Sequence, residues 1–256
     1  MGILDDFRLD GKTALVTGAS AGLGRGMAEG LAEAGADVIV VSRTAERLEG
    51  VRDTIRGAGR TCEAIPADIG DKDQIPGMIE AAKAVTGKID ILVNNAGTGF
   101  RAPPEDYPEE EWRRVMDLNI NAVWYCSQAV GRIMIGQGNG GKIVNTASLL
   151  SFQGGILVPP YAASKGAVMQ LTKSLANDWA KYNIQVNAIA PGYFATDLTA
   201  PIQKDEVRSR QIIERIPAER WGDPSDVKGA AVYLASAASN YVTGHILTVD
   251  GGWMGR

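Results

Sequence analysis

Hydrophobic positions along the chain fall into short β-branched runs that alternate with longer amphipathic stretches. This alternation predicts a parallel sheet whose strands are joined by crossover helices. Several of the runs are apolar without strict alternation, which is typical of strands covered by helices on both faces. We expect strands at 12–17, 38–42, 62–67, 89–94, 142–146, 184–190 and 243–249. We expect helices at about 23–34, 44–57, 72–86, 109–136, 160–181 and 224–236.

The same rhythm covers the whole chain, and no linker, low-complexity tract or internal repeat interrupts it. A chain of 256 residues can bury a substantial core as one unit. The predicted fold class is therefore α/β: a single doubly wound, Rossmann-like parallel sheet with helices on both faces, in one domain over 1–256. Residues 191–221 lack clear periodicity, and we expect them to form a lid over the substrate.

Composition limits the partners of the chain. A formal net charge of −4 argues against a nucleic-acid partner, because such proteins usually carry a basic surface. No apolar run reaches the roughly 18 residues that a membrane span needs, and the first residues lack the features of a secretion signal. Cys62 and Cys126 lie on apolar segments without metal-ligand spacing. We therefore expect reduced packing cysteines in a cytoplasmic protein, and no metal site.

The strand at 12–17 runs directly into a glycine-rich turn, Gly18-Ala-Ser-Ala-Gly22-Leu-Gly24, and then into a helix. Glycines in this context allow a tight turn and let backbone N–H groups approach a pyrophosphate at the helix N-terminus. A nucleoside triphosphate site would need Gly-Lys-Ser/Thr at the end of the loop, and that sequence is missing. The turn therefore predicts a dinucleotide site.

The end of the second strand bears on the choice between NADP and NAD. The acidic residue that would hold the ribose 2′-hydroxyl of NAD is missing, and Ser42-Arg43-Thr44 stands there instead. A hydroxyl followed by a guanidinium suits a 2′-phosphate, because Arg binds phosphate through charge-assisted hydrogen bonds. The alternative is that Arg43 simply opens the next helix beside Glu46 in solvent. We expect NADP in preference to NAD.

Candidate chemistry lies at the start of the helix at 160–181. Tyr161 and Lys165 are four residues apart, so both project from one helix face. A free tyrosine has a pKa near ~10, and a nearby cation would lower that pKa toward the working range of an acid/base. Ser148 follows the fifth strand, at the sheet edge where doubly wound folds bind their ligands. Its hydroxyl could hold a substrate oxygen while Tyr161 moves the proton.

Together these motifs resemble the short-chain dehydrogenase/reductase family over almost the whole chain. The matching pieces are TGASAGLG at 17–24, Asp68 after the third strand, NNAG at 94–97, Asn119 in MDLNINAV, Ser148, YAASK at 161–165, PG at 191–192 and VDGGW at 249–253. The resemblance implies an NAD(P)-dependent oxidoreductase that interconverts a secondary alcohol and a ketone.

The same resemblance implies four catalytic residues. Tyr161 would be the acid/base, and Ser148 would orient the carbonyl group. Lys165 would lower the tyrosine pKa and hold the nicotinamide ribose, while Asn119 would hold a water that links Lys165 to solvent. The residues implied to bind cofactor are Gly18, Ser20, Gly22, Leu23, Gly24, Ser42, Arg43, Asp68, Ile69, Asn95, Ala96, Tyr161, Lys165, Pro191, Gly192, Phe194 and Thr196.

Within the family, the segments 137–165, 187–197 and 215–227 resemble dehydrogenases that act on gluconate or on 2-dehydro-3-deoxy-D-gluconate. Because Arg43 favours NADP, we lean toward the pair D-gluconate/5-keto-D-gluconate. The alternative within the family is a reductase of 3-oxoacyl groups on a carrier protein. Such an enzyme would want a basic patch at its entrance, and 191–221 contains no compact one.

A sugar acid needs a cation for its carboxylate and polar groups for its hydroxyls. Arg101, just after NNAG, is the candidate for the carboxylate, with a solvated loop arginine as the alternative. Gln153 and Tyr193 are candidates for the hydroxyls, beside Ser148 and Tyr161 at the reacting carbon. These residues form the predicted substrate site.

The helices at 109–136 and 160–181 carry apolar or small residues on more than one face. Such helices must be covered on a second side, either by the internal core or by another molecule. The resemblance implies a second subunit, usually within a homotetramer. A catalytically silent, nucleotide-binding regulator is the remaining alternative, and it would be favoured by the loss of Tyr161 or Lys165, both of which are present.

Overall fold

A computed structural model describes residues 2–256, and its centre is one seven-stranded sheet in which all neighbouring strands are parallel. The strand order is β3-β2-β1-β4-β5-β6-β7. The strands are β1 (Thr13–Thr17), β2 (Asp37–Ser42), β3 (Cys62–Pro66), β4 (Ile91–Asn94), β5 (Gly141–Thr146), β6 (Ile184–Pro191) and β7 (Ile246–Val249). The order reverses between β1 and β4, so the predicted doubly wound α/β sheet is confirmed.

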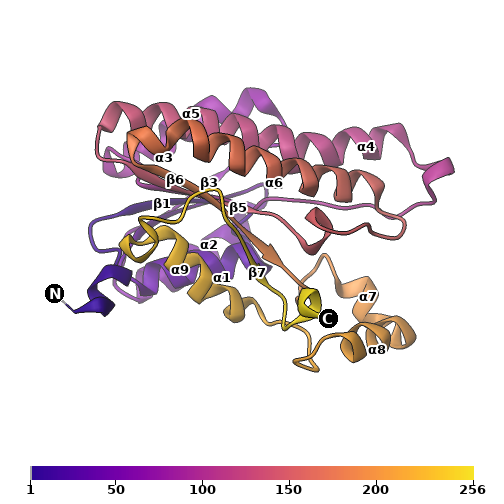
Figure 1. Cartoon of the computed structure of the whole chain (residues 1–256). Coiled ribbons are helices and arrows are strands. Elements are labelled where there is room, and N and C mark those ends of the chain that lie inside the picture. The colour runs from indigo at the N-terminus through magenta and orange to yellow at the C-terminus, as the bar shows by residue number, and fades with distance from the viewer. Residues whose placement is uncertain (1) are drawn as a thin grey trace.

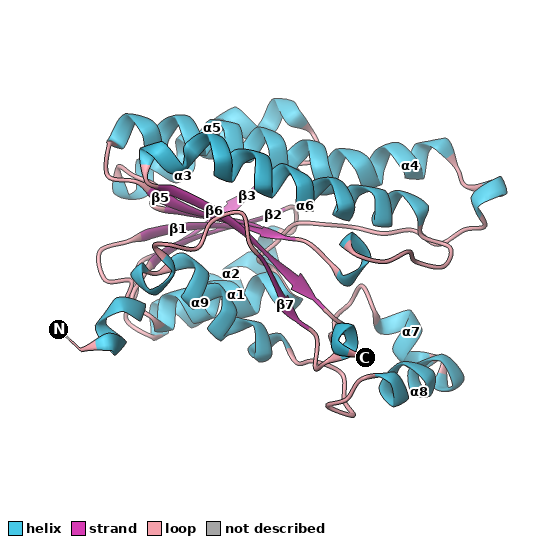
Figure 2. Cartoon of the chain, viewed as in Figure 1, coloured by secondary structure: helices cyan, strands magenta, loops and turns pink. Residues whose placement is uncertain are grey.

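Helices cover both faces of this sheet (Figure 1). Helices α3, α4, α5 and α6 lie on one face and α1, α2 and α9 on the other, while α7 and α8 lie near the C-terminus (Figure 2). Their bounds are α1 (Gly22–Glu33), α2 (Ala45–Gly57), α3 (Ile75–Thr86), α4 (Glu109–Met116), α5 (Ala122–Gln137), α6 (Pro159–Trp179), α7 (Ala200–Lys204), α8 (Glu206–Arg215) and α9 (Lys228–Ala235).

Alternate residues of one strand supply the two halves of the core. In β1, Val16 packs in a cluster with Met27 of α1, whereas Leu15 packs in a second cluster with Ile79 of α3. Both β1 residues are fully buried. Because side chains alternate across a strand, apolar residues at consecutive positions require cover on both faces. The lack of polar alternation in the sequence thus reflects this three-layer packing.

The predicted helix 109–136 is interrupted in the structure. A π-helical turn, Asp117–Asn121, separates α4 from α5. A π turn adds a residue to the helical turn, and such turns occur often at functional sites. The interruption is invisible in the hydrophobic pattern because its cause is distant in sequence: Asn119 inside the turn bonds Thr98 and Ser164.

The segment 191–221, whose sequence lacks clear periodicity, contains the helices α7 and α8. Helix α8 has a conventional start, since the Asp205 side chain accepts a hydrogen bond from Arg208 N. Only Ile212 of α8 is buried, so most of this helix faces solvent. In the described part of the chain, no helix is long and apolar enough to span a bilayer.

Candidate active site

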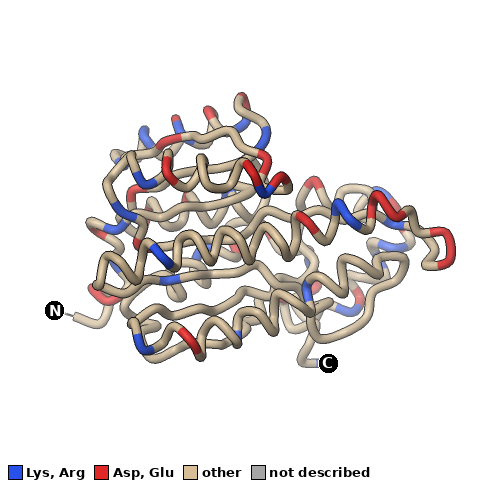
Figure 3. The backbone as a smooth tube through the Cα atoms, turned by 90° about the horizontal axis from the view of Figure 1, so that it is seen from above, with Lys and Arg blue, Asp and Glu red and all other residues tan. Residues whose placement is uncertain are grey.

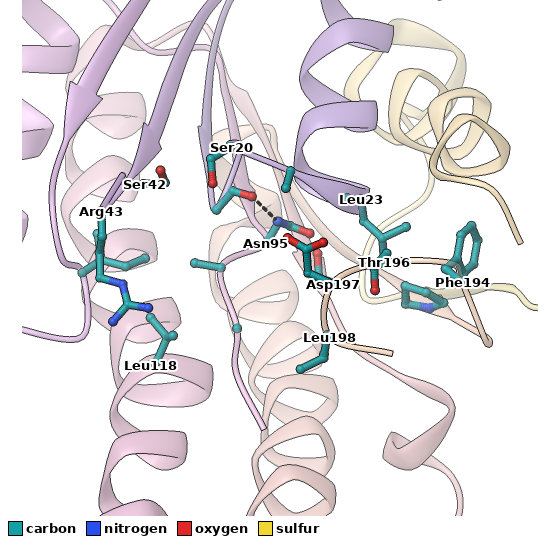
Figure 4. A pocket seen from close by; sticks show the side chains of 18 of the residues that line it. Ser20, Leu23, Ser42, Arg43, Asn95, Leu118, Phe194, Thr196, Asp197 and Leu198 are labelled. Atoms are coloured by element: carbon teal, nitrogen blue, oxygen red, sulfur yellow. Dashed lines mark hydrogen bonds between the residues drawn. The ribbon is translucent and has the colours of Figure 1, made fainter. Parts of the chain in front are cut away.

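A cleft of about 540 Å³ opens at the carboxyl ends of the strands, where the strand order reverses. In Figure 4, Ser42 and Arg43 lie on one side of it, and Thr196, Asp197 and Leu198 lie on the other. Open parallel sheets place their ligands at this crevice because the loops that follow adjacent strands diverge there. The cleft therefore gathers residues from eight separate parts of the chain.

The glycine-rich turn forms the wall of the cleft at the start of α1. Gly18 and Gly22 both have positive φ, +64° and +54°. A Cβ on Gly24 would lie 2.2 Å from the Gly18 carbonyl oxygen, so this glycine is needed for packing and does not itself line the cleft. The side-chain amide of Asn95 donates to the carbonyl oxygens of Thr17 and Gly18, at 3.1 Å each (Figure 4). Asn95 thus holds the turn in shape.

The first turn of α1 has no side-chain cap. Its N–H groups are available to an anion, and the helix dipole favours negative charge at this end. Deeper in the cleft, the Thr146 hydroxyl is buried and has no hydrogen-bond partner among residues 2–256. The free N–H groups at the start of α1 and the unpartnered hydroxyl of Thr146 lie at different places in the cleft. Both fit a long polar ligand such as a dinucleotide.

The end of the cleft beyond β2 carries two guanidinium groups, each beside an aspartate: Arg43 near Asp68 and Arg47 near Asp197. Arg43 is two-thirds exposed, and its Nη1 lies 3.8 Å from Asp68 Oδ2. Ser42 Oγ accepts a hydrogen bond from Thr44 N at 3.3 Å. Arg47, one turn along α2, also lines the cleft, although the sequence patterns did not single it out. Two guanidinium groups at the mouth of the cleft suit a phosphate.

Ser148, Tyr161 and Lys165 meet in the cleft. The Ser148 hydroxyl lies close enough to the Tyr161 phenol to lower its pKa, and Ser148 Oγ accepts a hydrogen bond from Leu150 N at 3.1 Å. Lys165 is buried, its Nζ donates to the carbonyl oxygen of Thr146 at 2.6 Å, and the same Nζ lies 5.7 Å from the centre of the Tyr161 ring. Their spacing of four on α6 brings Tyr161 and Lys165 together, as the sequence predicts.

The pKa of Tyr161 does not shift in the direction that the sequence predicts. Burial raises the pKa of Tyr161, the hydrogen bond with Ser148 lowers it, and the nearby Tyr193 hydroxyl raises it further. Burial lowers the pKa of Lys165 to about 8. The prediction that Lys165 lowers the pKa of Tyr161 is therefore not met in this structure. The reason is geometric, because the ammonium group bonds the Thr146 carbonyl rather than the phenol.

Asn119 is fully buried and is not among the residues that line the cleft. Its Oδ1 accepts from Thr98 N at 2.8 Å, and its Nδ2 donates to the Thr98 oxygen at 2.9 Å and to Ser164 Oγ at 3.2 Å. A Cβ on Gly97 would lie 3.4 Å from the Asn119 oxygen and 3.8 Å from Lys165 Nζ. Asn119 therefore ties the loop after β4 to α6, next to the lysine.

Of the five predicted substrate residues, Ser148 and Tyr161 line this cleft, whereas Arg101, Gln153 and Tyr193 lie outside its lining. Tyr193 packs edge-on against Trp221, with ring centres 5.7 Å apart, and against Trp253 at 4.7 Å. Its effect on the pKa of Tyr161 places the two phenols near each other. Arg101 is exposed and Gln153 is half-buried. The Ala102 N–H donates to the Leu157 oxygen, so their two loops adjoin beside Tyr161.

Apart from Gly24, every residue predicted to bind cofactor lines the cleft. Twelve lining residues were not predicted: Ala21, Val41, Thr44, Arg47, Ala67, Gly97, Leu118, Thr146, Ala147, Asp197, Leu198 and Thr199. Most of them lie at the end of a strand or in the loop that follows it, so the rule that ligands lie beyond the strand ends could have found them. Leu118 could not be found in that way, because only the π turn directs it to the cleft.

Comparison with known proteins decides the family. A short-chain dehydrogenase family model, described as enoyl-(acyl carrier protein) reductase, matches residues 18–254. The chain belongs to the short-chain dehydrogenase/reductase family. This short-chain dehydrogenase is 52% identical over 254 residues to the 2-dehydro-3-deoxy-D-gluconate 5-dehydrogenase of Dickeya dadantii, covering 99% of this chain and 100% of the relative. It is 44% identical over 248 residues to the gluconate 5-dehydrogenase of Gluconobacter oxydans, covering 97% and 96%.

A solved relative has the same fold. The gluconate 5-dehydrogenase of Burkholderia cenocepacia, crystallised with NADP and tartrate, superposes with a TM-score of 0.95 at 42% identity, covering all of both chains. The family and the full-length similarity confirm the resemblance read from the motifs, and with it an oxidoreductase of the short-chain type.

Proposed function

We propose that this short-chain dehydrogenase interconverts a hydroxyl group and a ketone at C5 of a six-carbon sugar acid, with NADP as its preferred cofactor. The observation that carries the proposal is the meeting of Ser148, Tyr161 and Lys165 at the end of β5, inside a cleft with an uncapped helix N-terminus. Relatives named for dehydrogenation at C5 of gluconate and of its 2-dehydro-3-deoxy analogue support the substrate class.

In the direction of reduction, Ser148, Tyr161 and Lys165 have separate roles. The nicotinamide cofactor, when bound, supplies the hydride that reaches the carbonyl carbon. The Ser148 hydroxyl donates a hydrogen bond to the carbonyl oxygen, and the Tyr161 hydroxyl transfers its proton to that oxygen. Lys165 offers its ammonium group to the ribose of the cofactor. Solvent then restores the proton on Tyr161, and oxidation follows the same steps in reverse.

Asn119 acts in this scheme as a positioning residue. Its amide fixes Thr98 and Ser164, so it sets the loop after β4 against the helix that carries Tyr161 and Lys165. The water relay implied by the family resemblance would pass beside this amide. That part of the role remains a prediction.

Two sugar acids are candidates for the substrate. The higher identity, 52% against 44%, favours 2-dehydro-3-deoxy-D-gluconate. The expectation of D-gluconate came from Arg43, which bears on the cofactor rather than on the sugar. Both acids present a carboxylate and a C5 hydroxyl, and we place the carboxylate at Arg101 and further hydroxyls at Gln153 and Tyr193. The carrier-protein reductase and the silent regulator have weaker support.

The test is an initial-rate screen of the purified protein with both cofactors. The substrates are D-gluconate, 2-dehydro-3-deoxy-D-gluconate, a neutral hexitol and, in the reverse direction, 5-keto-D-gluconate and an acetoacetyl thioester. We expect the highest kcat/KM on one of the sugar acids with NADP or NADPH. Activity confined to the thioester would replace the proposal with a carrier-protein reductase, and no turnover at all would favour the regulator.

We further propose a homotetramer in the cytoplasm, with residues 191–221 acting as a lid. Trp112, Trp124 and Tyr125 lie on α4 and α5 and are all more than a third exposed. Long stretches of the helical layer seen in Figure 3 carry few charges, as expected of a face that meets another subunit. Light scattering of the eluted protein gives the assembly directly.

A further inference from the structure

A second cavity, of about 200 Å³, lies at the opposite end of the sheet from the active-site cleft. The residues that precede β1, β4 and β5 line it, together with the turn after α9. Strand β5 separates the two sites, because the six steps along the chain from Lys142 to Ser148 span ~20 Å. The cavity is smaller than the ~300–1,000 Å³ typical of pockets for drug-sized ligands, so any ligand must be small.

Lys142 is the central side chain of this cavity, and it is 8% exposed. Its Nζ donates to Asn240 Oδ1 at 2.9 Å and to Ser239 Oγ at 3.4 Å. An ammonium group has three protons, and here two of them meet neutral acceptors. Within residues 2–256, no carboxylate oxygen lies within 4.0 Å of this nitrogen. A buried ammonium group normally has a counter-charge, because desolvation of an unpaired charge is costly.

The other charged groups of the cavity do not supply that counter-charge. The carboxylate of Asp90 accepts from Thr13 N at 2.9 Å and pairs with Lys88 at 3.1 Å and with Lys12 at 3.9 Å. Lys12 itself lines the cavity and adds to the burial that lowers the pKa of Lys142 to about 8.

Arg8, the remaining cation of the lining, is exposed and paired with Asp10 at 2.7 Å. With Arg8 compensated by Asp10, the two ammonium groups of Lys12 and Lys142 face the single lining carboxylate of Asp90. This local excess of positive charge stands out in a chain whose net charge is −4. A small anion would complete the charge balance of the cavity.

We propose that this cavity is a second binding site, separate from the active site, which takes a small oxyanion between Lys12 and Lys142. Phosphate and the carboxylate of a small acid share the required chemistry, namely negatively charged oxygens that accept hydrogen bonds from ammonium groups. Lys142 is the specific ligand, because its third proton lacks a partner, whereas Lys12 contributes mainly charge.

The test is thermal unfolding in the presence of saturating NADPH, which keeps phosphate out of the cofactor cleft. Sodium phosphate and sodium acetate are titrated separately against sodium chloride of equal ionic strength. Three proteins are compared: the wild type, Lys142→Met and Lys173→Met. Lys173 is an exposed lysine of α6 whose ammonium bonds Gln170, and it serves as the matched control. Neither substitution touches the catalytic residues, so turnover should stay at the wild-type level and report correct folding.

At an anion concentration tenfold above Kd, we expect the wild type and Lys173→Met to gain about 3–6 °C in Tm over the chloride control. Lys142→Met should bind the anion about 10- to 150-fold more weakly, because it loses a charged hydrogen-bond donor. A Lys142-dependent shift with phosphate alone identifies phosphate as the ligand, one with acetate alone identifies a small carboxylate, and one with both shows that the site takes either oxyanion. No shift beyond chloride with either anion, or an equal shift in Lys142→Met, overturns the proposal.

Discussion

Arg47 and Asp197 form an ion pair across the mouth of the cofactor cleft, with Nη1 and Oδ2 3.0 Å apart. Arg47 belongs to α2 and Asp197 to the segment between β6 and α7, so the pair joins residues 150 positions apart. The same segment approaches the glycine turn, where a Cβ on Gly22 would lie 3.2 Å from a methyl carbon of Thr196. The two contacts close the cleft above the site expected for the cofactor phosphates.

This pair should slow the release of cofactor. Both side chains are well exposed, so the contact is worth about 0.2–1 kcal/mol, or ~1.4- to 5-fold in a rate. Arg47→Ala and Asp197→Ala should each speed NADPH release by that factor in stopped-flow fluorescence, and the double variant should add nothing further. Arg52→Ala, which alters an exposed α2 pair outside the cleft, is the control. Independent, additive effects would mean that the pair is not a closing contact.

Tyr161→Phe should fold and bind cofactor while losing turnover. The ring keeps its packing, but the transferable proton is removed. General acid/base catalysis contributes typically ~10²–10⁴-fold, so kcat should fall by at least about 100-fold. Cofactor affinity is measured in parallel by fluorescence titration. Activity above about a tenth of wild type with intact cofactor binding would exclude Tyr161 as the acid/base.

The affinity for cofactor should depend on pH through Lys165. Burial lowers its pKa to about 8, and the ammonium form is the one that can donate to the ribose. Cofactor binding is therefore supported below pH 8 and weakens as pH rises through that value. Lys165→Met should bind more weakly at pH 7 and lose this pH dependence in calorimetric titrations between pH 6.5 and 9. If the variant keeps the wild-type slope, another group is responsible.

Arg43→Ala should weaken the binding of NADP and leave the binding of NAD nearly unchanged. A hydrogen bond to a charged group is worth roughly 1.5–3 kcal/mol, which corresponds to about 10- to 150-fold in affinity. The KM for NADP should rise by that factor, while the KM for NAD should hardly change because it has no 2′-phosphate. Wild-type protein that already works better with NAD would contradict the preference proposed for Arg43.

Arg101→Ala should discriminate between acidic and neutral substrates. If Arg101 binds the carboxylate, kcat/KM for gluconate or its deoxy analogue should fall about 10-fold or more, whereas kcat/KM for a neutral hexitol should hardly change. Gln153→Ala is a useful comparison, since it removes a neutral group on the adjoining loop and should affect both substrates alike. An equal loss of kcat/KM on the acidic and the neutral substrate in Arg101→Ala would mean that Arg101 supports the structure of its loop and does not bind the carboxylate.

Local sequence was sufficient wherever neighbours in the chain determine the geometry. The spacing of four between Tyr161 and Lys165 places both on one face of any helix. The turn at Gly18 and Gly22 needs positive φ, which glycine adopts at little cost. Apolar runs covered on both faces gave the strands and their order of appearance. These features follow from steric and periodic rules that act over a few residues.

Only the tertiary structure decided how distant segments meet. The π turn around Asn119 depends on hydrogen bonds to Thr98 and Ser164. The ion pair of Arg47 depends on the path of the chain after β6. Lys165 bonds the Thr146 carbonyl oxygen instead of lowering the pKa of the tyrosine. The same holds for the charge imbalance around Lys142, which arises where three strand ends and the turn after α9 converge. Such contacts require the strand register and helix packing to be in place, and no local pattern in the chain records them.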